Sequence, residues 1–230
     1  MHKSTLMILG HLLLFSYLVN ADMPRSFSAA KRLSAQIYSA NPNSFYCGCK
    51  IDWIEGKGVP NLESCGYEFR TQESRSERIE WEHIMPAWQF GHQRMCWKSG
   101  GRKNCSKDKQ YRMMEADLHN LVPAVGEVNG DRSNYRFSEW NGKPYQYGEC
   151  SIIVSFKDRK VQPPEYARGP IARIYLYMSE RYQLFLSDQQ RKLMSVWDNK
   201  YLPSSWECER NRLISEIQGW PNDYVSKKCI

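Results

Sequence analysis

The chain has little long hydrophobic sequence, and what it has lies at the N-terminus. Beyond residue 21, no stretch of the 230 residues is apolar enough to cross a bilayer. The sequence also contains no Gly/Ser-rich or Pro-rich linker and no internal repeat, so nothing divides it into modules. We therefore expect one soluble domain with a sizeable hydrophobic core.

Motifs typical of zinc sites are also missing. No His-Glu-x-x-His sequence occurs, which argues against a zinc metallopeptidase. The pair Cys47-Gly48-Cys49 is one residue too tight for the usual zinc knuckle, and no second close pair follows.

The N-terminal run has the pattern of a secretory signal peptide. Lys3 precedes apolar residues from Leu6 to Val19, and the small residue Ala21 follows. We expect cleavage after Ala21, which leaves residues 22–230 as the mature domain; an uncleaved anchor is the alternative. The protein would then be periplasmic or secreted.

All the cysteines lie after this segment. An even number of cysteines in an exported chain predicts disulfides in an oxidising compartment. The eight residues are Cys47, Cys49, Cys65, Cys96, Cys105, Cys150, Cys208 and Cys229. Their connectivity stays open, although a Cys96–Cys105 pair is favoured because it closes a short basic loop. Cys229 is expected to tie down the C-terminus.

Acidic residues are outnumbered. The chain has 32 Lys and Arg against 25 Asp and Glu, and 13% of its residues are aromatic. Removing Lys3 with the signal segment leaves 31 basic against 25 acidic residues, a net charge of +6. A basic exported protein suits a polyanion such as nucleic acid. General solubility or an anionic cell surface would also explain the charge.

Hydrophobic periodicity and capping residues predict an α+β fold that is mostly helical. Helices are expected over residues 26–40, 108–118, 123–130, 170–183, 188–201 and 205–218, and strands over 50–54, 79–83 and 152–156. Pro123 and Pro170 are interpreted as first residues of helices. Residues 70–78 and 88–109 are expected to be an exposed connection and a basic loop.

The strand over 79–83 carries the first candidate chemistry, Glu82 beside His83. A neutral histidine suits the deprotonation of water near neutral pH. Glu82 and Asn129 are oxygen ligands of the kind that Mg²⁺ uses, with waters completing its shell. Neighbouring residues of a strand point to opposite faces, so we expect the strand to end or kink at His83.

Four segments together resemble the bacterial endonuclease I family of periplasmic and secreted non-specific nucleases, within the ββα-metal (His-Me finger) superfamily. They are Trp81-Glu82-His83 with Pro86-Ala87, residues 115–121 with Pro123-Ala124, residues 126–134, and residues 168–173. The resemblance runs from about residue 26 to the C-terminus. It implies a ββα-metal core inside the disulfide-stabilised domain.

The resemblance also implies a role for each matching residue. His83 is the general base, and Glu82 and Asn129 bind one Mg²⁺, a site that Mn²⁺ or Ca²⁺ can also occupy. Arg102 contacts the phosphate, Glu115 is an acidic residue near the metal, and Asn120 braces the loop that holds His83. The family cleaves single- and double-stranded DNA and often RNA, leaving 5′-phosphates. We expect a monomer that does not associate with membranes.

Contacts with the phosphate backbone are assigned to basic residues. Arg102 and Lys103 lie in the basic loop, and Arg132 lies in the third motif. Arg168 and Arg173 flank the expected helix start at Pro170, where phosphate binding is favourable.

Two other functions remain possible from the residues alone. One is a metal-independent secreted ribonuclease that uses two histidines, for instance His83 and His119. The other is a non-catalytic protein for DNA binding or uptake. Structural hydrogen bonding is the simpler interpretation of His119, and His92 is expected at the surface.

Overall fold

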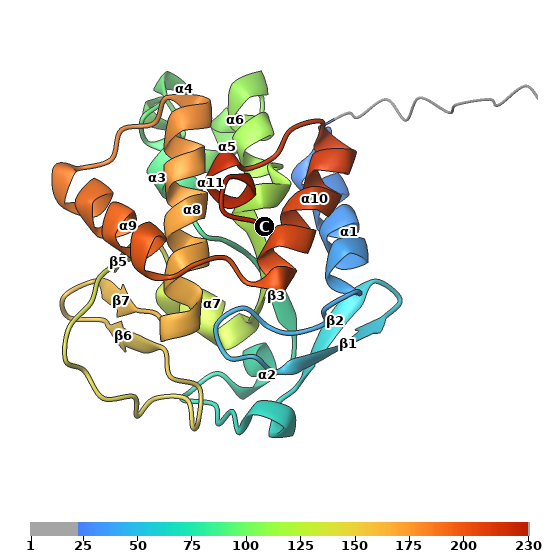
Figure 1. Cartoon of the computed structure of the whole chain (residues 1–230), viewed down its shortest axis with the longest axis vertical. Helices are drawn as coiled ribbons and strands as arrows, with labels where there is room; N and C mark the ends of the chain where they lie inside the picture. Colours follow the sequence, from blue (N-terminus) through green and yellow to red (C-terminus); the bar gives the residue numbers. More distant parts are fainter. Residues whose placement is uncertain (1–22, 230) are drawn as a thin grey trace, which may run out of the picture.

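The computed structural model describes residues 23–229, so the predicted signal peptide lies outside the described part (Figure 1). Its α-helices are α1 (Phe27–Tyr38), α2 (Glu73–Ser76), α3 (Ala87–Gly91), α4 (Met95–Lys98), α5 (Gly101–Cys105), α6 (Lys109–Glu115), α7 (Gly126–Arg132), α8 (Glu165–Tyr182), α9 (Asp188–Lys200), α10 (Ser205–Gln218) and α11 (Asp223–Ser226). Its strands are β1 (Lys50–Ile54), β2 (Lys57–Asn61), β3 (Ile79–His83), β4 (Leu121–Val125), β5 (Arg136–Phe137), β6 (Ile153–Ser155) and β7 (Lys160–Gln162). Two 3₁₀ turns cover Glu63–Cys65 and Leu118–Asn120.

The α+β fold is confirmed, with a helical body above three small sheets in Figure 1. Helix α8 runs through the centre and buries every residue from Ile171 to Ser179, including Tyr175 and Met178. One hydrophobic cluster extends from α1 through β4 and α8 to α10. Within residues 23–229, no helix combines the length and apolar character of a membrane span.

The unit that positions the candidate site consists of β3, β4 and α7. The two strands pair antiparallel, with Ile79 opposite Val125 and His83 opposite Leu121. Helix α7 begins directly after β4 and packs back against both strands. Strand β3 ends at His83, as expected for neighbouring residues with different tasks.

Polar caps fix several helix starts where the sequence predicted them. The side chains of Ser26, Asp108, Ser187 and Ser204 each accept a hydrogen bond from a backbone N–H in the first turn of α1, α6, α9 and α10. Helix α10 ends at a left-handed Gly219. At these helix ends, the local sequence was therefore sufficient to predict the boundary.

Both predictions that rested on proline were wrong. Pro123 lies inside β4 opposite Trp81, and the helix starts only at Gly126. A two-stranded sheet has an outer edge on each strand, where a missing N–H costs nothing. Pro170 lies inside α8, which begins at Glu165.

The two segments expected to be irregular contain short helices. Residues 88–109 form most of α3 and all of α4 and α5, and residues 70–78 contain α2. Helices of four or five residues are too short to show a hydrophobic period. Helix α2 also depends on distant Glu127, whose carboxylate accepts the N–H groups of Arg70, Thr71 and Gln72.

All eight cysteines are paired, which confirms the predicted disulfides. The pairs are Cys47–Cys150, Cys49–Cys65, Cys96–Cys105 and Cys208–Cys229. The favoured Cys96–Cys105 pair is present, and Cys229 ties the C-terminal segment to α10.

Candidate active site

The end of β3 opens into a cavity of about 310 Å³ between α5 and α7. It is lined by Phe27, Arg75, Trp81, Glu82, His83, Pro86, Ala87, Arg102, Asn129, Gly130, Arg132 and Ser133. The structure thus brings together the predicted base His83, the predicted ligands Glu82 and Asn129, and Arg102. These residues come from segments up to 47 positions apart.

The orientation of the His83 ring is fixed by the backbone of α6. Its Nε2 lies 2.8 Å from the carbonyl oxygen of Glu115. Because a carbonyl only accepts, Nε2 carries the hydrogen, and Nδ1 is left as the basic nitrogen. Burial lowers the pKa of His83 to about 4, so the ring is neutral at pH 7 and can accept a proton.

Asn120 holds the backbone that follows His83. Its Oδ1 accepts the Met85 N–H at 2.8 Å, and its Nδ2 donates to the Met85 carbonyl at 3.0 Å. Asn120 is fully buried, and its own carbonyl accepts the N–H of Ile84 at 3.1 Å. This is the geometry expected of a residue that braces the turn after the base.

Glu82 presents one carboxylate oxygen to the protein and keeps the other free. Tyr46 donates to Oε1 at 2.9 Å, and the guanidinium of Arg132 lies 3.2 Å from the same atom. Oε2 accepts no hydrogen bond from residues 23–229. Burial raises the pKa of Glu82 to about 7, with Arg132 opposing the shift, so a nearby cation would favour the ionised form.

Asn129 reaches the cavity from α7. Its Nδ2 donates to Glu80 Oε2 at 2.8 Å, which leaves Oδ1 as the available oxygen. Residues 23–229 contain no cluster of three or more His, Cys, Asp or Glu side chains suited to a metal. Two free oxygens with one negative charge nevertheless fit Mg²⁺, which uses few protein ligands and retains water.

Arg102 is the exposed cation at the cavity mouth. Its Nη2 and Nε lie 2.8 and 2.9 Å from Glu115 Oε1, and its side chain is 52% exposed. Glu115 therefore orients two side chains: its carboxylate binds the guanidinium of Arg102, and its backbone carbonyl binds the ring of His83. We had expected Glu115 near the metal, whereas its side chain is engaged with Arg102.

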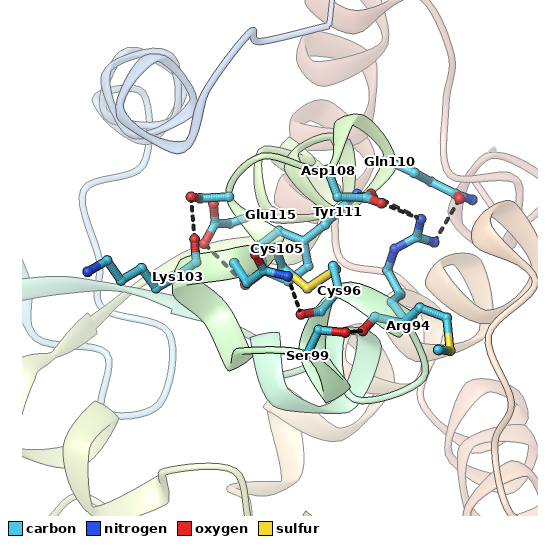
Figure 2. Close-up of a disulfide and its surroundings, with 12 residues drawn as sticks. Arg94, Cys96, Ser99, Lys103, Cys105, Asp108, Gln110, Tyr111 and Glu115 are labelled. Carbon is cyan, nitrogen blue, oxygen red and sulfur yellow. Dashed lines mark hydrogen bonds and ion pairs between the residues drawn. A yellow bond between two sulfur atoms is a disulfide. The ribbon is translucent and has the colours of Figure 1, made fainter.

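A disulfide secures the helices that carry Arg102 (Figure 2). Cys96 on α4 is bonded to Cys105 at the end of α5, close to Tyr111 and Glu115. In the same view Arg94 points to Asp108 and to Gln110, at 3.0 and 2.7 Å. The disulfide thus fastens α5 to α4, and Arg94 fastens the start of α4 to the start of α6.

Two arginines expected to contact nucleic acid are instead buried. The Arg173 guanidinium has no exposed surface and binds both Glu207 oxygens at 2.6 Å. Arg132 is equally buried and donates to the carbonyls of His83 and Ile84. The expectation failed for Arg173 because Pro170 does not start a helix, so no N-terminus faces solvent there.

Arg168 and Lys103 have different surroundings. Arg168 pairs with Glu139 at 2.8 Å, and only 12% of its side chain is exposed. Lys103 is exposed on α5 beside Arg102. Contact of either residue with nucleic acid stays a prediction.

The other two histidines of residues 23–229, His92 and His119, lie outside the cavity. His119 is 1% exposed, packs edge-on against Tyr177 and lies 3.2 Å from the Trp220 carbonyl oxygen. His92 stacks on Trp88 with ring centroids 4.1 Å apart. His119 therefore has the structural role expected of it.

Three residues at the site were not anticipated from the sequence: Tyr46, Arg75 and Glu80. Tyr46 approaches from 36 positions away, which no local pattern shows. Glu80 had a detectable signal, because residues two apart on a strand share a face and Glu82 was already suspected.

A histidine at the end of a strand, an antiparallel partner strand and a following helix with a free amide oxygen form the ββα arrangement that the resemblance implies. A sequence profile described as Endonuclease I matches residues 26–229. The chain belongs to this family and is an endonuclease.

The names of similar proteins agree with this assignment to a nuclease family. It is 53% identical over 225 residues to a periplasmic deoxyribonuclease of Aeromonas hydrophila, covering 97% of this chain and 95% of the relative. An extracellular deoxyribonuclease of the same organism is 54% identical, with 94% and 95% covered. Endonuclease-1 of Buchnera aphidicola subsp. Acyrthosiphon pisum (strain APS) is 53% identical, with 89% and 82% covered.

Proposed function

We propose that the protein hydrolyses phosphodiester bonds of single- and double-stranded DNA, and of RNA, with one Mg²⁺ ion, leaving 5′-phosphates. Its relatives named deoxyribonucleases support DNA as substrate. The observation that carries the mechanism is the single cavity that His83, Glu82 and Asn129 line together. Mn²⁺ or Ca²⁺ would occupy the same site.

His83 is the general base in this proposal. The Glu115 carbonyl holds the Nε2 hydrogen, so Nδ1 takes the proton from a water that attacks phosphorus. Its low pKa keeps it unprotonated over the whole neutral range. Asn120 keeps the following backbone in place, so the ring does not turn away.

Glu82 and Asn129 would hold the cation. A bound Mg²⁺ neutralises charge on the phosphate and stabilises the departing 3′ oxygen. Tyr46 and Arg132 fix Glu82 so that Oε2 faces the cavity. The two ligands contribute a single negative charge, which leaves a net positive site for an anionic substrate.

Arg102 and Lys103 would bind the substrate through its backbone. Both are exposed on α5, and Arg102 lines the cavity. Arg102 can exchange Glu115 for a phosphate oxygen with little movement, since it already lies at the solvent boundary. Backbone contacts carry no sequence information, which agrees with a non-specific nuclease. Arg168 would contact phosphate only after leaving Glu139.

Export and assembly belong to the same proposal. We propose that residues 1–21 are a cleaved signal peptide and that residues 22–230 form one monomeric nuclease domain. The four disulfides and the relatives named periplasmic or extracellular support an oxidising compartment, either the periplasm or the medium.

Plasmid digestion separates this proposal from its rivals. We expect degradation of plasmid DNA with Mg²⁺, none with EDTA, and none by His83→Ala although that variant still folds and binds DNA. Cleavage of RNA alone that persists in EDTA would support the two-histidine ribonuclease. DNA binding without cleavage under every condition would support the non-catalytic protein.

The structure gives the two-histidine ribonuclease little support. His119 does not line the cavity that contains His83, and its ring is enclosed by Tyr177 and the Trp220 carbonyl. Two histidines acting on one phosphate would have to face the same space.

A further inference from the structure

Glu80 lies on the same face of β3 as Glu82 and contacts the other proposed ligand, Asn129. Its Oε2 accepts Asn129 Nδ2 at 2.8 Å. We infer that Glu80 is a positioning residue: it selects the orientation of the Asn129 amide and so presents Oδ1 to the cation. This inference rests on the proposed function.

The chemistry of the two groups determines which amide atom faces which partner. A carboxylate can only accept, so the atom of Asn129 directed at Glu80 must be nitrogen. The oxygen then points away from Glu80, on the side of the cavity. Without Glu80 the amide can turn over and present its N–H groups, which repel a cation.

Glu80 is itself held on two sides by arginines, so it is a fixed acceptor. Arg75 forms a two-pronged pair with it, Nε to Oε1 at 3.0 Å and Nη2 to Oε2 at 2.6 Å. Arg78 adds contacts to Oε1 at 3.1 and 3.0 Å. Paired arginine–carboxylate bonds of this kind fix direction as well as distance. Glu80 is therefore already saturated and does not line the cavity.

Gly130 gives a second, independent observation: the absence of a side chain at this position makes room for Arg75. A β-carbon on Gly130 would lie 2.0 Å from Arg75 Nη1. Arg75 thus passes directly over α7 at the residue next to Asn129. Alanine at position 130 would displace the Arg75 guanidinium while leaving Glu80 and Asn129 chemically intact.

The test measures metal binding without catalysis. Mn²⁺ is titrated into the metal-free mature protein, and free Mn²⁺ is followed by its electron paramagnetic resonance signal. We expect Glu80→Ala to weaken Mn²⁺ binding about 10- to 100-fold, the usual effect of losing a group that orients a ligand. Gly130→Ala should weaken it in the same direction by less. Glu77→Ala, an exposed carboxylate on the same segment, should leave affinity unchanged.

A double substitution separates orientation from charge. Asp at position 129 offers an oxygen in either orientation, so it needs no positioning. In the Asn129→Asp background, Glu80→Ala should therefore leave Mn²⁺ affinity unchanged or improve it, because a like charge is removed. If Glu80 acted only through its negative charge, its loss would weaken binding equally in both backgrounds.

Each outcome bears on the inference. Equal Mn²⁺ affinity of wild type and Glu80→Ala would overturn it, and so would equal weakening in the two backgrounds. Thermal unfolding, measured alongside, should fall by the same amount in both backgrounds, because Arg75 and Arg78 lose the same partner in each. If wild type binds no Mn²⁺ and cleaves in EDTA, the proposed function fails instead.

Discussion

Asn120 uses both ends of one side-chain amide to hold the backbone two residues beyond His83. Both bonds are buried, so water cannot replace them. The position of His83, the proposed general base, thus depends on a residue that need not touch substrate. A defect here would affect catalysis through geometry and stability together.

Asn120→Ala is expected to destabilise the protein by about 2–4 kcal/mol, because the Met85 N–H and carbonyl lose their partners in a buried site. Urea unfolding measures this loss. Turnover should fall also under conditions where the variant is fully folded. Asn141→Ala, at an exposed position, is the matched control and should change neither quantity. Wild-type turnover by folded Asn120→Ala would contradict the claim that Asn120 braces the backbone after His83.

His119 makes stability depend on pH. Burial lowers its pKa to about 4, whereas an unfolded histidine titrates near 6.5. As pH falls from 6.5 towards 4, His119 takes up a proton in the unfolded chain but stays neutral in the folded protein. The free energy of unfolding therefore falls, by about 2 kcal/mol from this residue between pH 7 and pH 5.

His119→Phe keeps a ring against Tyr177 and removes the titration. Its free energy of unfolding should fall less between pH 7 and pH 5 than that of wild type, by about 2 kcal/mol. Urea midpoints at the two pH values measure the difference. Comparing the two proteins cancels Glu82, whose raised pKa acts in the opposite direction. Identical pH dependence in both would contradict the account.

At the residue scale, the sequence predicted the members of the site better than their surroundings. His83, Glu82, Asn129 and Arg102 were all expected, and they share one cavity. Of the residues that orient them, only Asn120 was expected. Tyr46 contacts Glu82 from 36 positions away, and a local pattern carries no information about such a contact.

Among the elements, short clamped helices are the distinctive feature near the site. Helix α5 has five residues, too few to be stable alone, and it carries Arg102. The Cys96–Cys105 bond and the Arg94–Asp108 pair hold this region together. The direction of Arg102 therefore depends on covalent support.

Replacing Cys96 and Cys105 by alanine should cost about 2–3 kcal/mol from the unfolded chain's regained freedom. It should also raise KM and lower kcat on DNA, because Arg102 loses its fixed position. Removing Cys208–Cys229 is the matched control: stability should fall, while kinetics of the folded enzyme stay unchanged. Unaltered kinetics in the Cys96/Cys105 variant would show that the disulfide does not fix the position of Arg102.

Element prediction succeeded where a boundary had local chemistry and failed where proline was ambiguous. The starts expected for four helices agree with the structure to within one residue, and a serine or aspartate cap lies at each. Pro123 suits the outer edge of a two-stranded sheet as well as a helix start, and only pairing with β3 distinguishes the two. The misplaced start of α8 in turn produced the wrong role for Arg173.

On the scale of the whole molecule, the helical body supports the unit formed by β3, β4 and α7. The proposed base, His83, lies at the end of β3, the carbonyl that orients its ring belongs to α6, and the proposed metal ligand Asn129 lies on α7. Four disulfides fasten the segments around this unit. In the proposed function, the excess of basic residues attracts the polyanionic substrate and the cavity carries out its hydrolysis.

The central claim is that His83 acts as a base beside a bound divalent ion. Plasmid digestion by wild type and His83→Ala, with Mg²⁺ titrated against EDTA, tests it most directly. We predict cleavage only by wild type and only with free Mg²⁺, at equal folding and DNA binding of the two proteins. Cleavage by purified His83→Ala at the wild-type rate, or by wild type in excess EDTA, would contradict it.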